Sequence, residues 1–95
     1  MKLGQSIKKL RVNKAKQVQY LFAQNIGITQ AYLSQIESDK KEPSTELLQK
    51  IAAYFQIPLP ILFWYSVTED DIRTEKQEYF KVLKPSIDSL ISTFF

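Results

Sequence analysis

Residues 19–38 space small and apolar side chains in a way that is typical of two short helices joined by a tight turn. Counted from Gln19, a small residue, Ala23, is the fifth and a glycine, Gly27, is the ninth. Ala23 lets the second helix approach closely, and Gly27 can take φ > 0 at the end of the first helix without a β-carbon penalty. Five apolar residues then share one face, which we expect to be buried: Phe22, Ile26, Ile28, Leu33 and Ile36.

The length of the chain, 95 residues, suffices for one compact domain with room for a C-terminal appendage. The chain has no cysteine, which excludes a disulfide framework and a thiolate metal site and fits a reducing cytosol. Its N-terminus lacks the apolar segment of a signal peptide. The longest apolar stretch, residues 57–65, contains two prolines and is far shorter than the ~20 residues that span a bilayer. We therefore expect a cytoplasmic protein without a membrane segment.

Charge is distributed unevenly along the chain. Residues 1–50 hold nine Lys/Arg and four Asp/Glu, whereas residues 51–95 hold four Lys/Arg and six Asp/Glu, so the net charges are +5 and −2. A basic half favours a polyanionic partner, most often a nucleic acid, although the same imbalance can serve solubility alone.

Glycine and proline are sparse and alternating β-branched residues are rare, so we predict an all-α fold. Thr29 is a suitable N-cap for a helix over about 30–38, and Ser44 for the helix that follows. Pro85 should break or kink the last helical stretch. The expected helices are 3–13, about 18–26, about 30–38, one that begins after Ser44, 59–65, 70–83 and 86–94. We divide the chain into a domain of residues 1–66 and a C-terminal helical extension of residues 67–95.

Residues 3–63 resemble the Cro/repressor-type (XRE) helix-turn-helix family of bacterial and phage transcriptional regulators. The resemblance is carried by Ile7-Lys-Lys-Leu-Arg11, Gln19, Phe22-Ala23, Ile26-Gly-Ile-Thr29, Tyr32-Leu-Ser-Gln-Ile-Glu37 and the stretch from Pro43-Ser44 to Ile51-Ala52. It implies a five-helix, lambda-repressor-like domain whose recognition helix, about 30–38, lies in the major groove of double-stranded DNA. It also implies a sequence-specific regulator, which we expect to be a repressor.

The resemblance assigns roles to individual residues. Gln30, Ala31, Ser34 and Gln35 lie where other members touch base edges, and glutamine can offer adenine a donor and an acceptor together. Tyr32 can stack or bond at the backbone, or pack inward. Arg11 and Glu37 match a partly buried ion pair that ties the first helix to the third. The residues that we expect at DNA phosphates are Gln19, Thr29, Lys14, Lys16, Ser38, Lys40 and Lys41.

The sequence departs from the family pattern in three places. The connection Lys14-Ala-Lys-Gln17 is one residue longer than usual and lacks its common glycine, and Val18 replaces a capping Ser or Thr. Because of these two changes the sequence does not define the first residue of the second helix, and the assignment of Gln19 to a DNA phosphate is weaker. The third change puts Pro60-Ile61 in place of an acidic pair and makes the fifth helix unusually apolar.

An apolar stripe runs along the C-terminal third, with steps of three and four residues. It can fold back on its own domain, or it can pack on a twin chain, and we favour the homodimer because the family usually reads two-fold operators. The expected dimer interface is Phe63, Trp64, Phe80, Leu83, Ile87, Leu90, Ile91 and Phe94. A different reading makes the chain an antitoxin or protein antagonist whose C-terminal helices bind a partner protein. A third makes it a controller of a restriction–modification operon.

The sequence offers little for catalysis. It has no His, no Cys, no glycine-rich phosphate loop and no metal-ligand spacing, so we predict neither an enzyme nor a cofactor. The run Glu69-Asp70-Asp71 could bind a hard cation, but carboxylates in a first helical turn are explained more simply by the helix dipole. A membrane-surface role for the C-terminus is disfavoured because that end has no basic face.

Overall fold

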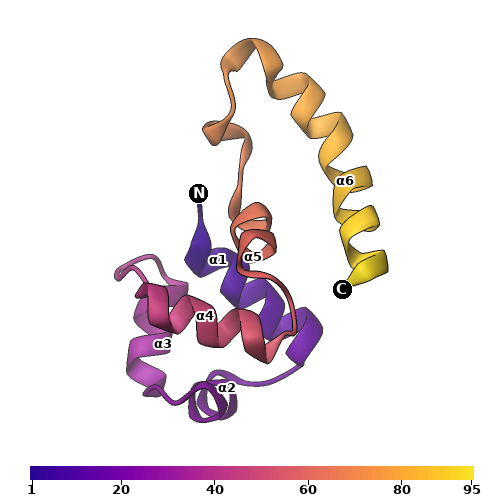
Figure 1. The fold of residues 1–95 in the computed structure, drawn as a ribbon. Helices are drawn as coiled ribbons and strands as arrows, with labels where there is room; N and C mark the ends of the chain where they lie inside the picture. The colour runs from indigo at the N-terminus through magenta and orange to yellow at the C-terminus, as the bar shows by residue number, and fades with distance from the viewer.

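The computed structural model describes all residues, 1–95, and is all-α, as predicted. Helices α1 to α5 gather into one body, and α6 stands beside it, joined by an extended connection (Figure 1). The π-helical η1 continues α1, and two short 3-10 turns, η2 and η3, precede α6. The bounds are α1 Leu3–Lys9, η1 Leu10–Ala15, α2 Gln19–Ile26, α3 Gln30–Glu37, α4 Thr45–Tyr54, α5 Leu59–Ser66, η2 Glu69–Asp71, η3 Thr74–Lys76 and α6 Gln77–Phe94.

The core lies entirely within the five-helix body. Thirteen apolar residues are buried there, and the most enclosed apolar side chains come from all five helices: Ile7, Phe22, Leu33, Ile36, Ile51 and Leu62. Four of the five apolar residues predicted to share one face are in this cluster, and Ile28 packs against it half-buried. The Phe22 and Tyr54 rings pack edge to face, with 5.4 Å between their centroids. The helix-turn-helix spacing of the sequence therefore builds the centre of the domain.

Local capping fixes where the motif helices begin and end. The Tyr32 amide donates to Thr29 Oγ1 at 3.1 Å, and the Leu47 amide donates to Ser44 Oγ at 3.1 Å, which confirms both predicted caps. Gly27 ends α2 with φ 78°, in the left-handed region that favours glycine. Val18 precedes α2 and supplies no side-chain cap. The turn before α2 has no glycine and takes its left-handed residue from Lys16, φ 55°.

The predicted helix over 70–83 is wrong in its start. Thr68 and Asp71 form a capping box, with the Thr68 amide donating to Asp71 Oδ2 at 2.8 Å, but it closes only the 3-10 turn η2. The backbone is extended at Ile72 and Arg73, which ends that turn. The Gln77 side-chain amide then donates to the carbonyl oxygens of Glu69 and Ile72, at 3.1 and 3.3 Å. These bonds stabilise the break, and α6 begins only at Gln77.

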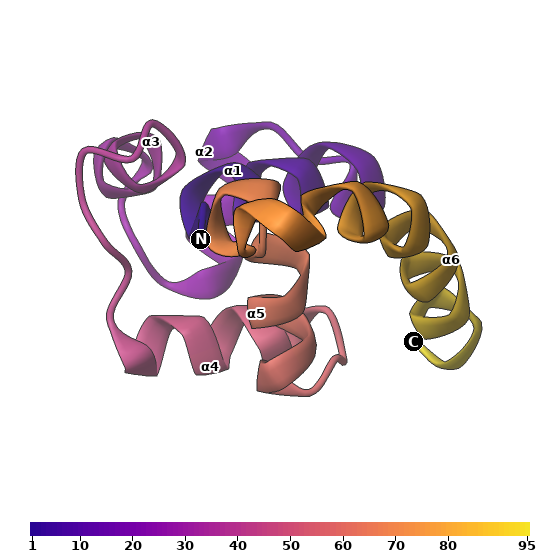
Figure 2. The same ribbon diagram turned by 90° about the horizontal axis from the view of Figure 1, so that it is seen from above.

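Pro85 was predicted to break or kink the last helix, and of these two outcomes the break between residues 83 and 86 is wrong. Helix α6 is continuous from Gln77 to Phe94 with the proline inside it. Figure 2 shows α6 bending on its way to the C-terminus. A proline lacks the amide that would bond the carbonyl four residues earlier and crowds that carbonyl, so a bend is the expected consequence. Neighbouring hydrogen bonds keep the helix intact on both sides.

Helix α6 touches the body mainly through Trp64 on α5. The indole Nε1–H donates to Asp88 Oδ1 at 2.8 Å, the ring meets Phe80 at 6.2 Å between centroids, and Lys84 Nζ lies 5.1 Å from the ring centre. No residue of α6 is buried.

None of the helices, taken singly, combines the length and the apolar character needed to cross a membrane. Only α4 and α5 taken together pass on length and composition, across a bend of 100°, and these two helices supply much of the buried core.

Candidate nucleic-acid interface

Helix α3 has one buried side and one exposed side. Leu33 and Ile36 are completely buried against α2 and the core, and they hold the helix in place. On the opposite side Gln30, Ala31 and Ser34 are exposed, and Gln35 is half-buried at the margin. We call these four residues the α3 face. The face presents two amides, a methyl and a hydroxyl, which are groups that can pair with base edges in a major groove.

Tyr32 lies between the two sides of α3. It is half-buried, packs against the core, and has Lys41 Nζ 6.0 Å from its ring centre. The ring therefore packs partly inward and also supports a cation next to the α3 face.

Arg11 and Glu37 form a buried ion pair between η1 and α3. Arg11 Nε donates to Glu37 Oε2 at 2.8 Å and Nη2 donates to Oε1 at 3.0 Å, a two-pronged geometry. The third guanidinium contact is with the Gln17 carbonyl oxygen at 2.8 Å. Glu37 Oε1 also accepts from Gln19 Nε2 at 2.9 Å. One carboxylate thus fixes both η1 and the first residue of α2 against α3.

Sequence reasoning missed Gln17, which links three parts of the domain. Its carbonyl accepts from Arg11, its Nε2 donates to the Tyr54 hydroxyl at 2.6 Å, and its Oε1 accepts from Asn25 Nδ2 at 3.1 Å. No motif marks a glutamine for such a role, because its partners lie on helices whose packing only the folded chain brings together.

Most of the lysines predicted at phosphates, and Ser38, lie beside the helix-turn-helix, whereas Lys14 points toward the end of α6. Lys16, Lys40 and Lys41 are exposed beside the motif, and the amides of Lys40 and Lys41 donate to the Gln35 carbonyl at 2.9 and 3.2 Å. The Ser38 hydroxyl donates to the same carbonyl at 3.3 Å. Lys14 differs, because its Nζ lies 3.3 Å from the Phe95 carbonyl oxygen at the end of α6.

Comparison with known proteins assigns the chain to a family. A helix-turn-helix family model matches residues 7–62, from α1 to α5. The chain belongs to the XRE-type helix-turn-helix family. A curated relative, Control protein C.MunI of Mycoplasma sp., is 38% identical over 63 residues, which make up 66% of this chain and 85% of the relative. No solved structure matches the chain at a significant level. As a member of this family the protein is a DNA-binding transcriptional regulator.

The apolar residues predicted for a dimer interface are distributed over α5 and α6 of this XRE-type regulator. Phe63, Trp64, Phe80 and Ile91 are half-buried within the chain. The exposed fractions of the other four are high for apolar side chains: Leu83 53%, Ile87 38%, Leu90 61% and Phe94 72%. We call these four residues the α6 stripe.

Proposed function

We propose that this XRE-type regulator reads base pairs with the α3 face. The supporting observation is that Leu33 and Ile36 anchor one side of α3 in the core while Gln30, Ala31 and Ser34 stay free on the other. Gln30 and Gln35 suit adenine, Ala31 suits a thymine methyl, and Ser34 can donate or accept. Tyr32 contributes at the edge of the face. Binding blocks access to the operator, so the protein acts as a repressor in the cytoplasm, without chemistry on the DNA.

Phosphate contacts surround the α3 face in this proposal. Gln19, whose amide Glu37 orients, and Thr29 lie at the starts of α2 and α3, where helix dipoles favour an anion. Ser38 and the exposed Lys40 and Lys41 follow the end of α3, and Lys16 lies on the turn before α2. Lys14 is directed to the end of α6 and is left out of this set.

We further propose that residues 67–95 form a dimerisation element, distinct from the DNA-binding domain of residues 1–66. Phe80, Lys84 and Asp88, which meet Trp64, recur on one side of α6. The α6 stripe lies on a different side, so the helix turns one aromatic and two charged side chains toward its own domain and leaves the four large apolar side chains of the stripe exposed. A second copy of the chain would cover the stripe and place two α3 faces on a two-fold operator, with half-sites about one helical turn apart.

A second candidate function rests on the same stripe. An antitoxin or antagonist would use the α6 stripe to hold a different protein, and it would be a monomer when purified alone. Control of a restriction–modification operon is a narrower form of the regulator proposal. The relative's name, a control protein, favours it, and neighbouring genes for a nuclease and a methyltransferase would support it.

Selection of bound sites from random duplex DNA tests the main proposal. We expect enrichment of a two-fold symmetric site, and sedimentation should show a dimer. Leu90→Gln should dissociate the dimer and weaken binding to the full site, whereas Val82→Gln, on another exposed side of α6, should change neither. Failure to enrich any sequence would contradict base reading. A monomer that selects single half-sites would contradict the dimer and favour the antagonist.

A further inference from the structure

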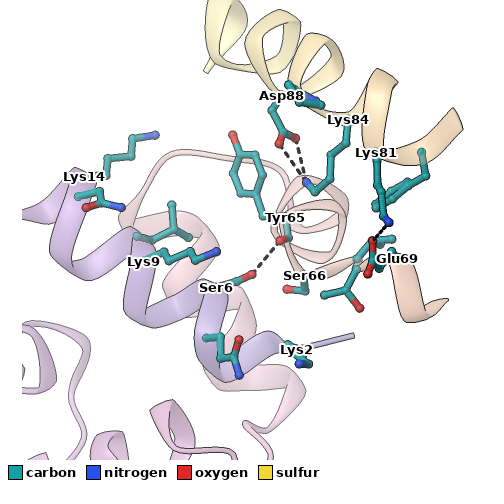
Figure 3. Close-up of a pocket in the computed structure, with 17 residues that line it drawn as sticks. Lys2, Ser6, Lys9, Lys14, Tyr65, Ser66, Glu69, Lys81, Lys84 and Asp88 are labelled. Atoms are coloured by element: carbon teal, nitrogen blue, oxygen red, sulfur yellow. Dashed lines mark hydrogen bonds and ion pairs between the residues drawn. The ribbon is translucent and has the colours of Figure 1, made fainter. Parts of the chain in front are cut away.

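A groove of about 760 Å³ separates α6 from α1 and α5. In Figure 3, Lys2 and Lys9 lie on one wall, Lys84 and Asp88 on the other, and Tyr65 between them. A volume of this size is within the range of roughly 300–1,000 Å³ that small-molecule sites occupy. None of the residues of the α3 face lines the groove. It is therefore a separate feature from the proposed DNA contacts.

The groove has an excess of positive charge. Five lysines line it, Lys2, Lys9, Lys14, Lys81 and Lys84, against two carboxylates, Glu69 and Asp88. Both carboxylates are already occupied, Glu69 by Lys81 at 3.3 Å and Asp88 by Lys84 at 3.0 Å. The Lys2 and Lys9 ammonium groups have no carboxylate within ion-pair distance. Two cations, Lys2 just before α1 and Lys9 at its end, are thus available to an incoming anion.

The uncharged lining of the groove is half apolar or aromatic and half polar. Its apolar and aromatic residues are Leu10, Tyr65, Val67, Phe80 and Pro85, and its polar residues are Gln5, Ser6, Asn13, Ser66 and Thr68. The hydroxyl of Tyr65 makes no hydrogen bond within the chain, whereas its carbonyl accepts from Ser6 Oγ at 2.8 Å. A ligand that fits these walls needs an apolar body, a negative group for Lys2 and Lys9, and an acceptor for the phenol.

We propose that this groove is a binding site for a small aromatic anion, a carboxylate, sulfonate or phosphate on a ring system. The negative group lies between Lys2 and Lys9, and the ring lies against Tyr65 and Phe80. The ligand contacts both α1 and α6, so it stabilises the position of α6, which otherwise meets the body mainly at Trp64. The site is independent of DNA, and its test needs no operator.

Anilinonaphthalene sulfonate, an aromatic anion whose fluorescence rises on binding, is the first probe. We expect one bound probe per chain, and energy transfer from Trp64, the single tryptophan, which lies on α5 beside α6. The neutral phenylnaphthylamine, which keeps the rings but lacks the charge, should bind more weakly by up to about fivefold, the upper end of what one exposed ion pair supplies. Inorganic phosphate should compete only at high concentration, because it lacks the apolar body.

Variants of the full chain locate the probe. Lys2→Gln/Lys9→Gln should weaken probe binding by about tenfold, somewhat more than one exposed pair supplies. The matched control, Lys8→Gln/Lys76→Gln, removes the same charge from exposed lysines outside the groove and should leave binding unchanged. Circular dichroism of each variant checks that the fold is retained.

Three results would overturn the proposal. The first is an equal loss in both double variants, which would mean general electrostatic attraction. The second is loss of probe binding in Leu90→Gln with no loss in Lys2→Gln/Lys9→Gln, which would place the probe on the α6 stripe. The third is equal affinity for the charged and neutral probes. Each of these results is independent of whether the chain binds an operator.

Discussion

Gly4 on α1 passes so close to Ile36 on α3 that a β-carbon at Gly4 would overlap the main-chain carbonyl oxygen of Ile36. Gly4 is buried, and Asp39 Oδ1 would lie only 2.7 Å from a β-carbon added at Gly4. The absence of a side chain at residue 4 therefore sets the distance between α1 and α3. This spacing also determines how Arg11, which follows on η1, reaches Glu37.

Gly4→Ala should destabilise the domain by about 1–3 kcal/mol or more, because the obstacle is backbone and cannot move aside like a flexible side chain. Urea unfolding followed by circular dichroism measures the loss. Lys8→Ala, on an exposed part of the same helix, should change the free energy of unfolding by less than about 0.5 kcal/mol.

Gly27→Ala is the informative comparison for Gly4→Ala. A β-carbon at Gly27 meets nothing within 4 Å, but φ 78° strains any L side chain. The expected loss is about 1–2 kcal/mol, from backbone conformation alone, and Gly27→Asn should lose less. A smaller loss for Gly4→Ala than for Gly27→Ala would mean that α1 and α3 are not packed as described.

Lys16→Gly should stabilise the protein. Lys16 has φ 55°, a conformation that disfavours a β-carbon by about 1–2 kcal/mol, and glycine removes this strain while adding about 0.5–1 kcal/mol of chain entropy in the unfolded state. The net gain should be about 0.5–1 kcal/mol in denaturant unfolding. Lys16→Ala removes the charge but keeps the strain, so a gain in that variant would point to charge instead.

The Arg11–Glu37 pair should show strong non-additivity. Glu37→Met leaves the buried Arg11 guanidinium unpaired and should cost about 3–5 kcal/mol of unfolding free energy. Arg11→Met/Glu37→Met removes both charges and should lose less than either single change. The double-mutant cycle is measured by chemical denaturation. Additive losses would show that the two side chains are not coupled in solution.

Much of the helical structure of residues 1–66 could be predicted from the sequence, because the apolar spacing and the N-caps that specify it are contained in short stretches of chain. The apolar spacing from Phe22 to Ile36 specifies the crossing of α2 and α3, and Thr29 and Ser44 mark helix starts through bonds to amides three residues ahead. The exposure of the α3 face follows from the same periodicity. What these residues contact on DNA stays a prediction.

The rest depends on contacts that no short window contains. The sequence gives no sign that residue 4 must be glycine, since the demand comes from a carbonyl on α3. The cap at Thr68 is a genuine capping box, yet Gln77 bonds the carbonyls of Glu69 and Ile72 and delays the helix to residue 77. Likewise, the groove beside α6 exists because the helix presents Lys84 and Asp88, and not the α6 stripe, to its own domain.

Base and phosphate contacts should respond differently to substitution. Gln30→Ala should weaken binding to the selected site by about 1–3 kcal/mol and relax preference at one base pair. Lys40→Ala should weaken all sequences alike and reduce the slope of log affinity against log salt by about one unit. Competition binding at several salt concentrations separates the two. The same uniform loss in both variants would contradict the assignment of the α3 face.

Tyr65 reports where α6 lies in solution. Burial raises the pKa of Tyr65, and the negative charge of Asp88 on α6 raises it further. Tyrosinate absorbance should therefore show one of the five tyrosines titrating last, and Tyr65→Phe should remove that step. In the unfolded chain this tyrosine loses its proton at about pH 10, whereas in the folded chain it keeps the proton to a higher pH. The free energy of unfolding should therefore fall as the pH rises from about 10 through the raised pKa of Tyr65.

Asp88→Asn tests the placement directly, because it removes the charge without removing the side chain. The last tyrosine step should move down toward the ordinary value, and the alkaline loss of stability from Tyr65 should shrink with it. Asp70→Asn, a neutralisation at an exposed carboxylate that is not among the causes of the Tyr65 shift, is the matched control and should leave the step in place. An unchanged Tyr65 step in Asp88→Asn would mean that α6 does not rest beside α5 in solution, and the groove between them would then not form.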